Sequence, residues 1–151
     1  EEKAVFARPA VLPAAVVGHI DGDDYDAYIG RAVGKFREGF YGNPWPTRVY
    51  GREEAIARFR RQAALDEPYC ANVRTGLAGR TLGCWCRRRG HRSPACHGDV
   101  LAVLANAGES ELARARAAVE REVAGMEEGA RAAEARDWQE YRRAWPAGQR
   151  P

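Results

Sequence analysis

The chain has 151 residues, of which 45% are hydrophobic and 30% charged, and its formal net charge at pH 7 is +3. This length and composition indicate one soluble globular domain that can bury a core without disulfide bonds. The sequence contains no apolar run of about 18 residues, the length of a membrane-spanning helix. No basic segment precedes the apolar stretch 10–20, as it would in a signal peptide. The sequence therefore predicts a cytoplasmic protein that does not cross a membrane.

The basic charge is concentrated in the middle of the chain. Residues 48–92 contain 11 arginines and 4 acidic residues, a net charge of +7, and only 2 of the 24 basic residues in the chain are lysines. The planar guanidinium group of arginine suits paired hydrogen bonds to phosphate and carboxylate. This segment is therefore where we expect an anionic partner or substrate to bind.

The residue pattern predicts an α/β fold, with α+β as the alternative, in which helices flank a small sheet. We expect residues 1–13 to be an extended lead-in, 14–108 to be the core domain, and 109–151 to be a C-terminal helical extension. Segments 14–20 and 25–29 have the apolar residues of two short strands. The Gly/Asp cluster between these segments is typical of a hairpin turn, so the pattern predicts an N-terminal β-hairpin.

A loop and a helix follow the predicted hairpin. Residues 32–48 place glycines and prolines among aromatic residues, which is typical of a long functional loop. Residues 52–66 have acidic residues in the first turn and apolar residues at helical spacing, and these features predict a helix. Pro68 is expected to mark its end, and 69–80 to be a connection, with a short helical turn as an option.

The second half of the chain is predicted to be mostly helical. Residues 81–86 read as a short buried strand, and 98–107 as a helix that Gly108 terminates. Residues 109–144 have apolar residues in steps of three or four, which predicts one amphipathic helix or two, with Gly125 and Gly129 as weak points.

All four cysteines lie within 27 residues: Cys70, Cys84, Cys86 and Cys96. Without a secretion signal, reduced thiols used for metal binding or chemistry are favoured over disulfides. Three thiols and the imidazole of His97 have the composition of a tetrahedral zinc site, so Cys84, Cys86, Cys96 and His97 are the predicted ligands and zinc the predicted cofactor. Alternate residues of a strand face opposite sides, which counts against Cys84 and Cys86 sharing one ion unless the strand ends there. Cys70 is a substitute ligand.

The same segment has a second interpretation that needs no metal. Cys96 and His97 lie at the start of the predicted helix 98–107, where the helix dipole lowers the pKa of a thiol. Nearby arginines favour the thiolate further: Arg87, Arg88, Arg89 and Arg92. A thiolate beside an imidazole is an activated nucleophile, so Cys96, His97 and Asp99 are candidate catalytic residues. A third interpretation is that these cysteines are buried and inert.

Several short motifs occur in a fixed order: Tyr28-Ile29-Gly30-Arg31, Gly42-Asn43-Pro44, Arg52-Glu53-Glu54, Leu82-Gly83-Cys84-Trp85-Cys86 and Cys96-His97-Gly98-Asp99-Val100-Leu101. Together they resemble a small family of bacterial and phage proteins that is catalogued as a domain of unknown function. The resemblance covers about residues 14–106 and implies no particular activity. The chain has Tyr41 where the family has tryptophan, and its loop between the last two motifs is longer and richer in arginine.

The resemblance groups residues that would line one pocket, from a strand end, a turn and the Cys/His cluster. In an α/β sheet, ligands bind at the carboxyl ends of strands. Arg31 and Cys86 both follow such ends if their strands run parallel. The candidate ligand-binding residues are Arg31, Asn43, Trp45, Arg87, Arg88 and Arg89. For Gly42-Asn43-Pro44 the alternative is a tight turn, and for the aromatic residues a small core.

These features leave three functions open. The first is an enzyme that acts on a nucleotide, a nucleoside or another phosphorylated small molecule. The second is a nucleic-acid-binding module with a structural zinc site. The third is a structural or assembly protein that uses the C-terminal helix, which is also a candidate homodimer interface. A net charge of +7 in residues 48–92 is modest for a dedicated nucleic-acid binder, so the sequence favours the enzyme.

Overall fold

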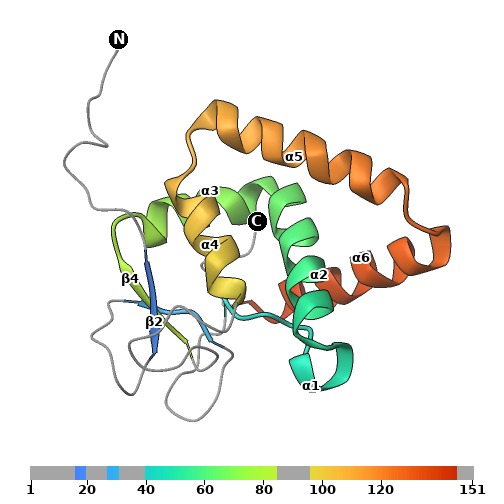
Figure 1. Cartoon of the computed structure of the whole chain (residues 1–151), viewed down its shortest axis with the longest axis horizontal. Helices are drawn as coiled ribbons and strands as arrows, with labels where there is room; N and C mark the ends of the chain where they lie inside the picture. The colour runs from blue at the N-terminus through green and yellow to red at the C-terminus, as the bar shows by residue number, and fades with distance from the viewer. Residues whose placement is uncertain (1–15, 20–26, 31–39, 85–95, 146–151) are drawn as a thin grey trace.

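The structure is a computed structural model that describes residues 16–19, 27–30, 40–84 and 96–145. Helices dominate these ranges and a small sheet lies at one end (Figure 1), so the fold is α/β only in a broad sense. The elements in chain order are β2 (Val16–His19), β3 (Ala27–Tyr28), α1 (Thr47–Tyr50), α2 (Arg52–Leu65), α3 (Glu67–Leu77), β4 (Thr81–Cys84), α4 (His97–Asn106), α5 (Glu109–Ala124) and α6 (Glu128–Arg143).

The sheet has the strand order β2-β4-β3, and β4 pairs in parallel with both neighbours. Leu82 of β4 pairs with Val17 on one side and with Ala27 on the other, and its side chain is fully buried. The predicted N-terminal hairpin is therefore wrong, because its two strands are not antiparallel neighbours. The local turn pattern predicted it, whereas the pairing depends on β4, which follows three helices later in the chain.

Helix α2 confirms the helix predicted over residues 52–66, but the connection predicted at 69–80 is wrong. Residues Glu67–Leu77 form α3, and Pro68 lies in its first turn. A proline is tolerated there because the first-turn N–H groups have no partner within the helix. The Asp66 carboxylate accepts a hydrogen bond from the Tyr69 N–H (3.0 Å), which caps the new helix. Pro68 therefore belongs to a helix start rather than to a helix end.

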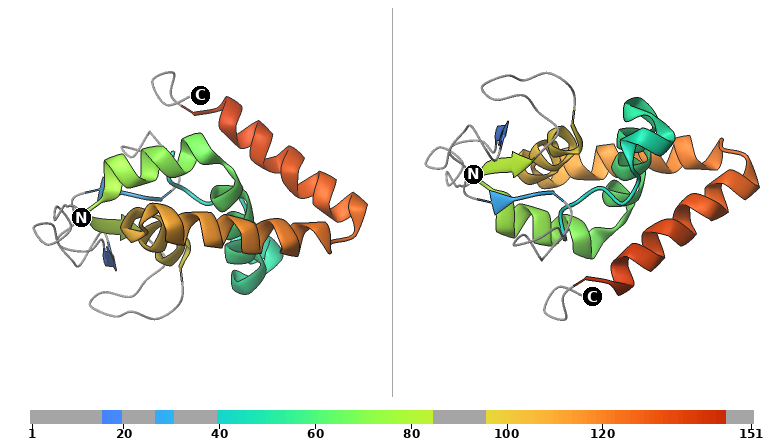
Figure 2. Two further views of the ribbon diagram at one scale, coloured as in Figure 1. Left: turned by 90° about the horizontal axis from the view of Figure 1, so that it is seen from above. Right: turned by 90° about the horizontal axis from the view of Figure 1, so that it is seen from below.

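The helices predicted in the second half of the chain are confirmed. Helix α4 covers His97–Asn106, and the amphipathic segment forms two helices, α5 and α6, which residues 125–127 connect. The break thus falls at Gly125, whereas Gly129 lies within the first turn of α6. Helix α5 leads away from the sheet and α6 returns toward the body of the molecule (Figures 1 and 2). Within the residues that the structure describes, no helix has the length and apolar character needed to cross a membrane.

The hydrophobic core includes aromatic side chains from both the predicted core domain and the predicted extension. The large buried rings are Phe40, Trp45, Phe59, Tyr69, Trp138 and Trp145. Trp138 of α6 lies at the centre of this group, and its indole N–H donates to the carboxylate of Asp66 (2.9 Å). Helix α6 therefore completes the core that surrounds the loop 40–46.

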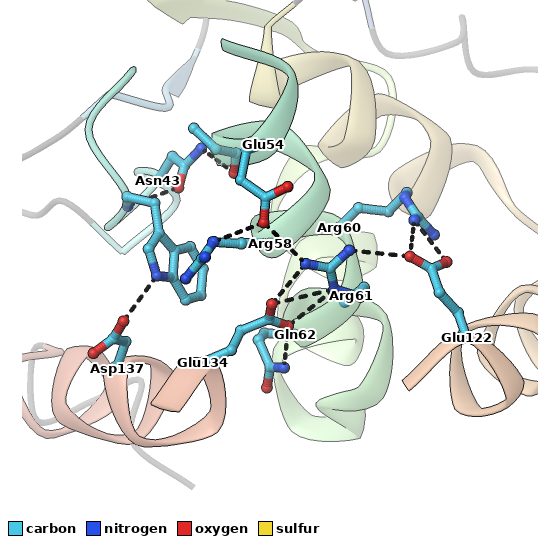
Figure 3. A network of polar contacts seen from close by, with 11 residues as sticks. Asn43, Glu54, Arg58, Arg60, Arg61, Gln62, Glu122, Glu134 and Asp137 are labelled. Atoms are coloured by element: carbon cyan, nitrogen blue, oxygen red, sulfur yellow. Dashed lines mark hydrogen bonds and ion pairs between the residues drawn. The ribbon is translucent and has the colours of Figure 1, made fainter. Parts of the chain in front are cut away.

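A network of charged side chains also ties α2 to α5 and α6 (Figure 3). The guanidinium of Arg61 donates to Glu134 of α6 (2.7 Å) and to Glu122 of α5 (3.1 Å). Glu122 also accepts hydrogen bonds from Arg60 (2.8 Å). These hydrogen bonds, that of Arg60 foremost, lower the pKa of Glu122.

Candidate functional site

The candidate site lies where the carboxyl ends of the three strands meet the N-terminus of α4. Because β3 and β4 are parallel, the chain leaves both strands at the same edge of the sheet. The prediction that Arg31 and Cys86 follow strand ends at one edge required parallel strands, and the strands are parallel. The two residues themselves lie outside the described ranges. This edge is where α/β proteins bind ligands.

Helix α4 approaches the sheet closely because its first turn contains Gly98. A Cβ atom added to Gly98 would lie 2.7 Å from Cδ1 of Ile29 and 3.0 Å from Cγ1 of Val17. Both distances are shorter than ordinary van der Waals contacts. The missing side chain therefore lets the helix N-terminus, with Cys96 and His97, rest on β2 and on the end of β3.

Cys96 is the N-cap residue of α4. Its Sγ accepts a hydrogen bond from the Gly98 N–H (3.2 Å), and its own N–H donates to the Asp99 carboxylate (3.0 Å). This reciprocal arrangement is a capping box in which a thiol takes the place of the usual hydroxyl. The described contact of Asp99 is therefore a structural one, and its catalytic role stays a prediction.

The ring of His97 is held by two backbone carbonyl groups. Its Nε2 lies 2.7 Å from the oxygen of Ile29 and 3.1 Å from that of Tyr41. A carbonyl oxygen only accepts hydrogen bonds, so Nε2 carries the proton and donates it. In the neutral ring, Nδ1 is then an acceptor, and it lies 3.7 Å from Sγ of Cys96. The side chain of Phe59 packs edge-on against the ring at a centroid distance of 5.3 Å.

This arrangement suits two kinds of chemistry. Nδ1 of His97 can accept the thiol proton of Cys96, and the Gly98 N–H and the helix N-terminus would stabilise the resulting thiolate. Alternatively, Sγ and Nδ1 could bind one metal ion. Typical zinc–ligand distances place a sulfur and a nitrogen of one tetrahedral site about 3.6 Å apart, close to the 3.7 Å between these atoms. The Nε2 donation to a carbonyl is the usual support of a metal-bound histidine.

The predicted zinc site is only partly described. Cys86 and the side chain of Cys84 lie outside the description, so the ligand set Cys84, Cys86, Cys96 and His97 stays a prediction. Among the described residues, no group of three or more His, Cys, Asp and Glu side chains could hold a metal ion. Cys70 lies in α3, where its thiol donates to the carbonyl of Ala63 (3.1 Å) and burial raises its pKa. These are the properties of a packed, unreactive thiol.

Asn43 and Trp45 make contacts that stabilise the loop 40–46. The Asn43 amide donates to the carbonyl of Ala55 (3.0 Å) and accepts from the Trp45 N–H (2.9 Å). Trp45 is 1% exposed, and its indole N–H donates to Asp137 of α6 (3.0 Å). These contacts are those of a tight turn and a core residue, and ligand binding by the two residues stays a prediction.

The remaining ligand-binding candidates lie outside the described ranges: Arg31, Arg87, Arg88 and Arg89. The structure also identifies site groups that the sequence did not reveal. These are the carbonyls of Ile29 and Tyr41, which hold His97. A backbone carbonyl has no residue signature, so only the folded chain could reveal them.

Replacing Gly98 by alanine is expected to lower the free energy of unfolding by about 1–3 kcal/mol, the usual cost of overpacking. The new methyl group would push α4 away from Ile29 and Val17. Urea denaturation of both proteins measures the effect. Gly125→Ala is the matched control, because a Cβ atom added there would lie 3.6 Å from the carbonyl oxygen of Glu122 and the φ of Gly125 is −86°. A Gly98→Ala protein as stable as the control variant would contradict this packing argument.

The family model for a domain of unknown function, DUF4326, matches residues 18–107. This region contains β3, the loop 40–46, β4 and α4, and therefore Cys96, His97 and the two carbonyl groups that hold the His97 ring. The sequence matches no curated protein and no solved structure. Because the matched region covers more than half of the chain, the protein belongs to the DUF4326 family.

Proposed function

We propose that this protein is an enzyme that acts on a nucleotide, a nucleoside or another phosphorylated small molecule, with Cys96 as its nucleophile. The observation that carries the proposal is the pairing of Cys96 Sγ with Nδ1 of His97 at 3.7 Å. Both carbonyl contacts of His97 are made by Nε2, which leaves Nδ1 as the basic atom. The ring is therefore oriented to accept the thiol proton.

The proposed chemistry is nucleophilic substitution. Nδ1 of His97 takes the proton from Sγ, and the thiolate attacks an electrophilic atom of the substrate. A bond from sulfur to that atom forms as the bond to the leaving group breaks, and His97 returns the proton to the leaving group. The Gly98 N–H, 3.2 Å from Sγ, stabilises the thiolate before attack.

The proposed substrate class follows from charge and position. The first turn of a helix favours anions, and α4 begins at the edge of the sheet where ligands bind in α/β proteins. Segment 48–92 carries a net charge of +7, of which Glu122 and Glu134 neutralise a part by pairing with Arg60 and Arg61. Further arginines of this segment follow β4 in the chain, and guanidinium groups suit a phosphate group. Arg31, Arg87, Arg88 and Arg89 are the residues we propose to hold it.

A zinc site is the second candidate, and the burial of the pair favours it. Cys96 is 1% exposed and His97 is 5% exposed, whereas reactive cysteines are usually partly exposed. In this alternative, Cys84, Cys86, Cys96 and His97 bind zinc, and the module binds nucleic acid through its arginines. A closed site with four protein ligands is typical of structural zinc.

Alkylation by iodoacetamide distinguishes the two candidates, with each cysteine followed by peptide mass spectrometry. If Cys96 is a thiolate nucleophile, we expect it to react at least about tenfold faster than Cys70, which is equally buried. His97→Gln should remove this difference, and adenosine 5′-monophosphate should slow the reaction. Equal rates at Cys96 and Cys70 would contradict the enzyme proposal.

Metal analysis of the purified protein completes the test. About one zinc ion per chain, lost in Cys96→Ser and retained in Cys70→Ser, would support the second candidate instead. A folded, metal-free protein with a reactive Cys96 would support the first.

A further inference from the structure

The loop 40–46 lies between His97 and helix α6, and its carbonyl groups contact both. The carbonyl of Tyr41 accepts from Nε2 of His97 (3.1 Å). The carbonyls on either side of it contact α6 instead. The hydroxyl of Tyr141 donates to the oxygen of Gly42 (2.6 Å) and lies 3.1 Å from that of Phe40. The Tyr141 hydroxyl thus contacts the carbonyls on both sides of Tyr41, and that of Phe40 also accepts from the Tyr69 hydroxyl (3.3 Å).

From these contacts we infer that Tyr141 is a positioning residue for the Cys96–His97 pair. It acts through the loop: its hydroxyl fixes the carbonyl of Gly42 and contacts that of Phe40, which orients the carbonyl of Tyr41 between them toward Nε2 of His97. Together with the shorter hydrogen bond to the Ile29 carbonyl (2.7 Å), that contact keeps the proton on Nε2 and Nδ1 directed at the thiol. Only the expected effect on the reactivity of the Cys96 thiol rests on the proposed function. The effect of Tyr141 on His97 stands on the contacts alone.

The surroundings of Tyr141 keep its hydroxyl in place. Its ring packs against Trp138 and Trp145, with centroid distances of 5.4 Å and 5.9 Å. A second link from α6 to the same loop is the hydrogen bond from the Trp45 indole to Asp137 (3.0 Å). Side chains one helical turn apart on α6 therefore hold both ends of the loop.

Helix α6 lies outside the region 18–107 that matches the family model. The site of this chain is therefore not confined to the matched region. A segment that composition alone marks as an extension contributes a group that orients the site. This assigns to α6 a role in the chemistry of the site in addition to its packing role.

The test is Tyr141→Phe, which keeps the ring packing and removes only the hydroxyl. We expect the His97 Nε2 proton, followed by nitrogen-15 NMR of the imidazole groups, to exchange with solvent about tenfold faster. That factor corresponds to about 1.4 kcal/mol, roughly one hydrogen bond. We also expect the ratio of the alkylation rates of Cys96 and Cys70 to fall about tenfold.

Glu134→Gln is the control, because it weakens the attachment of α6 to Arg61 without touching the loop. A purely structural role of Tyr141 would leave the His97 proton unchanged, or would speed exchange and alkylation at both cysteines equally in Tyr141→Phe and in the control. Either result would overturn the inference. If the His97 proton responds but Cys96 is never more reactive than Cys70, the inference about Tyr141 and His97 holds and the proposed nucleophile is wrong.

Discussion

Replacing Trp138 by alanine is expected to lower the free energy of unfolding by about 3–5 kcal/mol, the usual cost of removing a large buried aromatic side chain. The side chain is 2% exposed. Its ring lies parallel to that of Trp45, with a centroid distance of 6.1 Å, and edge-on to those of Tyr69 and Trp145. The cavity left behind would border several rings at once, and rigid rings cannot collapse into it.

The same substitution removes a hydrogen bond of Asp66. The Asp66 carboxylate accepts from the Trp138 indole (2.9 Å), and it also caps α3. Urea denaturation measures the total loss. Val103→Ala is the control, because Val103 is 64% exposed and its change should stay within about 0.5 kcal/mol. A loss of less than about 1 kcal/mol in Trp138→Ala would mean that α6 is not part of the core.

Replacing Glu134 by alanine is expected to cost about 3 kcal/mol, the lower end of the range for breaking a buried ion pair. The side chains of Arg61 and Glu134 are 9% and 2% exposed, and their nearest atoms are 2.7 Å apart. The loss comes mainly from leaving the Arg61 charge buried. Glu122 remains beside Arg61 (3.1 Å), which limits the cost.

The double variant Arg61→Met with Glu134→Leu separates the charge from the packing. Apolar side chains of similar size have no charge to desolvate, so we expect the double variant to recover most of the stability lost in Glu134→Ala. Denaturation of the single and double variants in parallel measures the recovery. A double variant less stable than Glu134→Ala would contradict this expectation. It would show that the ion pair itself stabilises the folded protein more than apolar packing at the same two positions.

The network also has an expected pH dependence through Glu122. Hydrogen bonds from Arg60 and Arg61 lower the pKa of this carboxyl in the folded protein. The ionised group therefore stabilises the folded state at neutral pH. This contribution decreases as the pH falls from the ordinary pKa of the carboxyl in the unfolded chain through its lowered pKa in the folded protein, because the unfolded chain binds the proton first.

The helices were predictable because their signals are local. The acidic first turn and apolar spacing of α2 lie within the helix itself, as do the apolar steps of α5 and α6. The start of α4 was predictable for the same reason, since Cys96, His97 and Asp99 follow each other at a helix N-terminus. The end predicted at Pro68 was wrong because a proline is compatible with both a helix end and a helix start. The capping hydrogen bond from the Tyr69 N–H to Asp66 shows that a helix starts here.

By itself, the sequence identified Cys96 and His97 as candidates, because a cysteine and a histidine are adjacent at the predicted start of a helix. The tertiary structure alone decided how they are held. Parallel pairing on both sides of β4 replaces the expected hairpin, since a strand's partners depend on burial of residues distant in the chain, such as Val17, Leu82 and Ala27. The tautomer of His97 depends on two carbonyl groups, and the loop that supplies one of them depends on Tyr141. Backbone groups carry no residue identity, so their contribution to the site becomes visible only when the chain is folded.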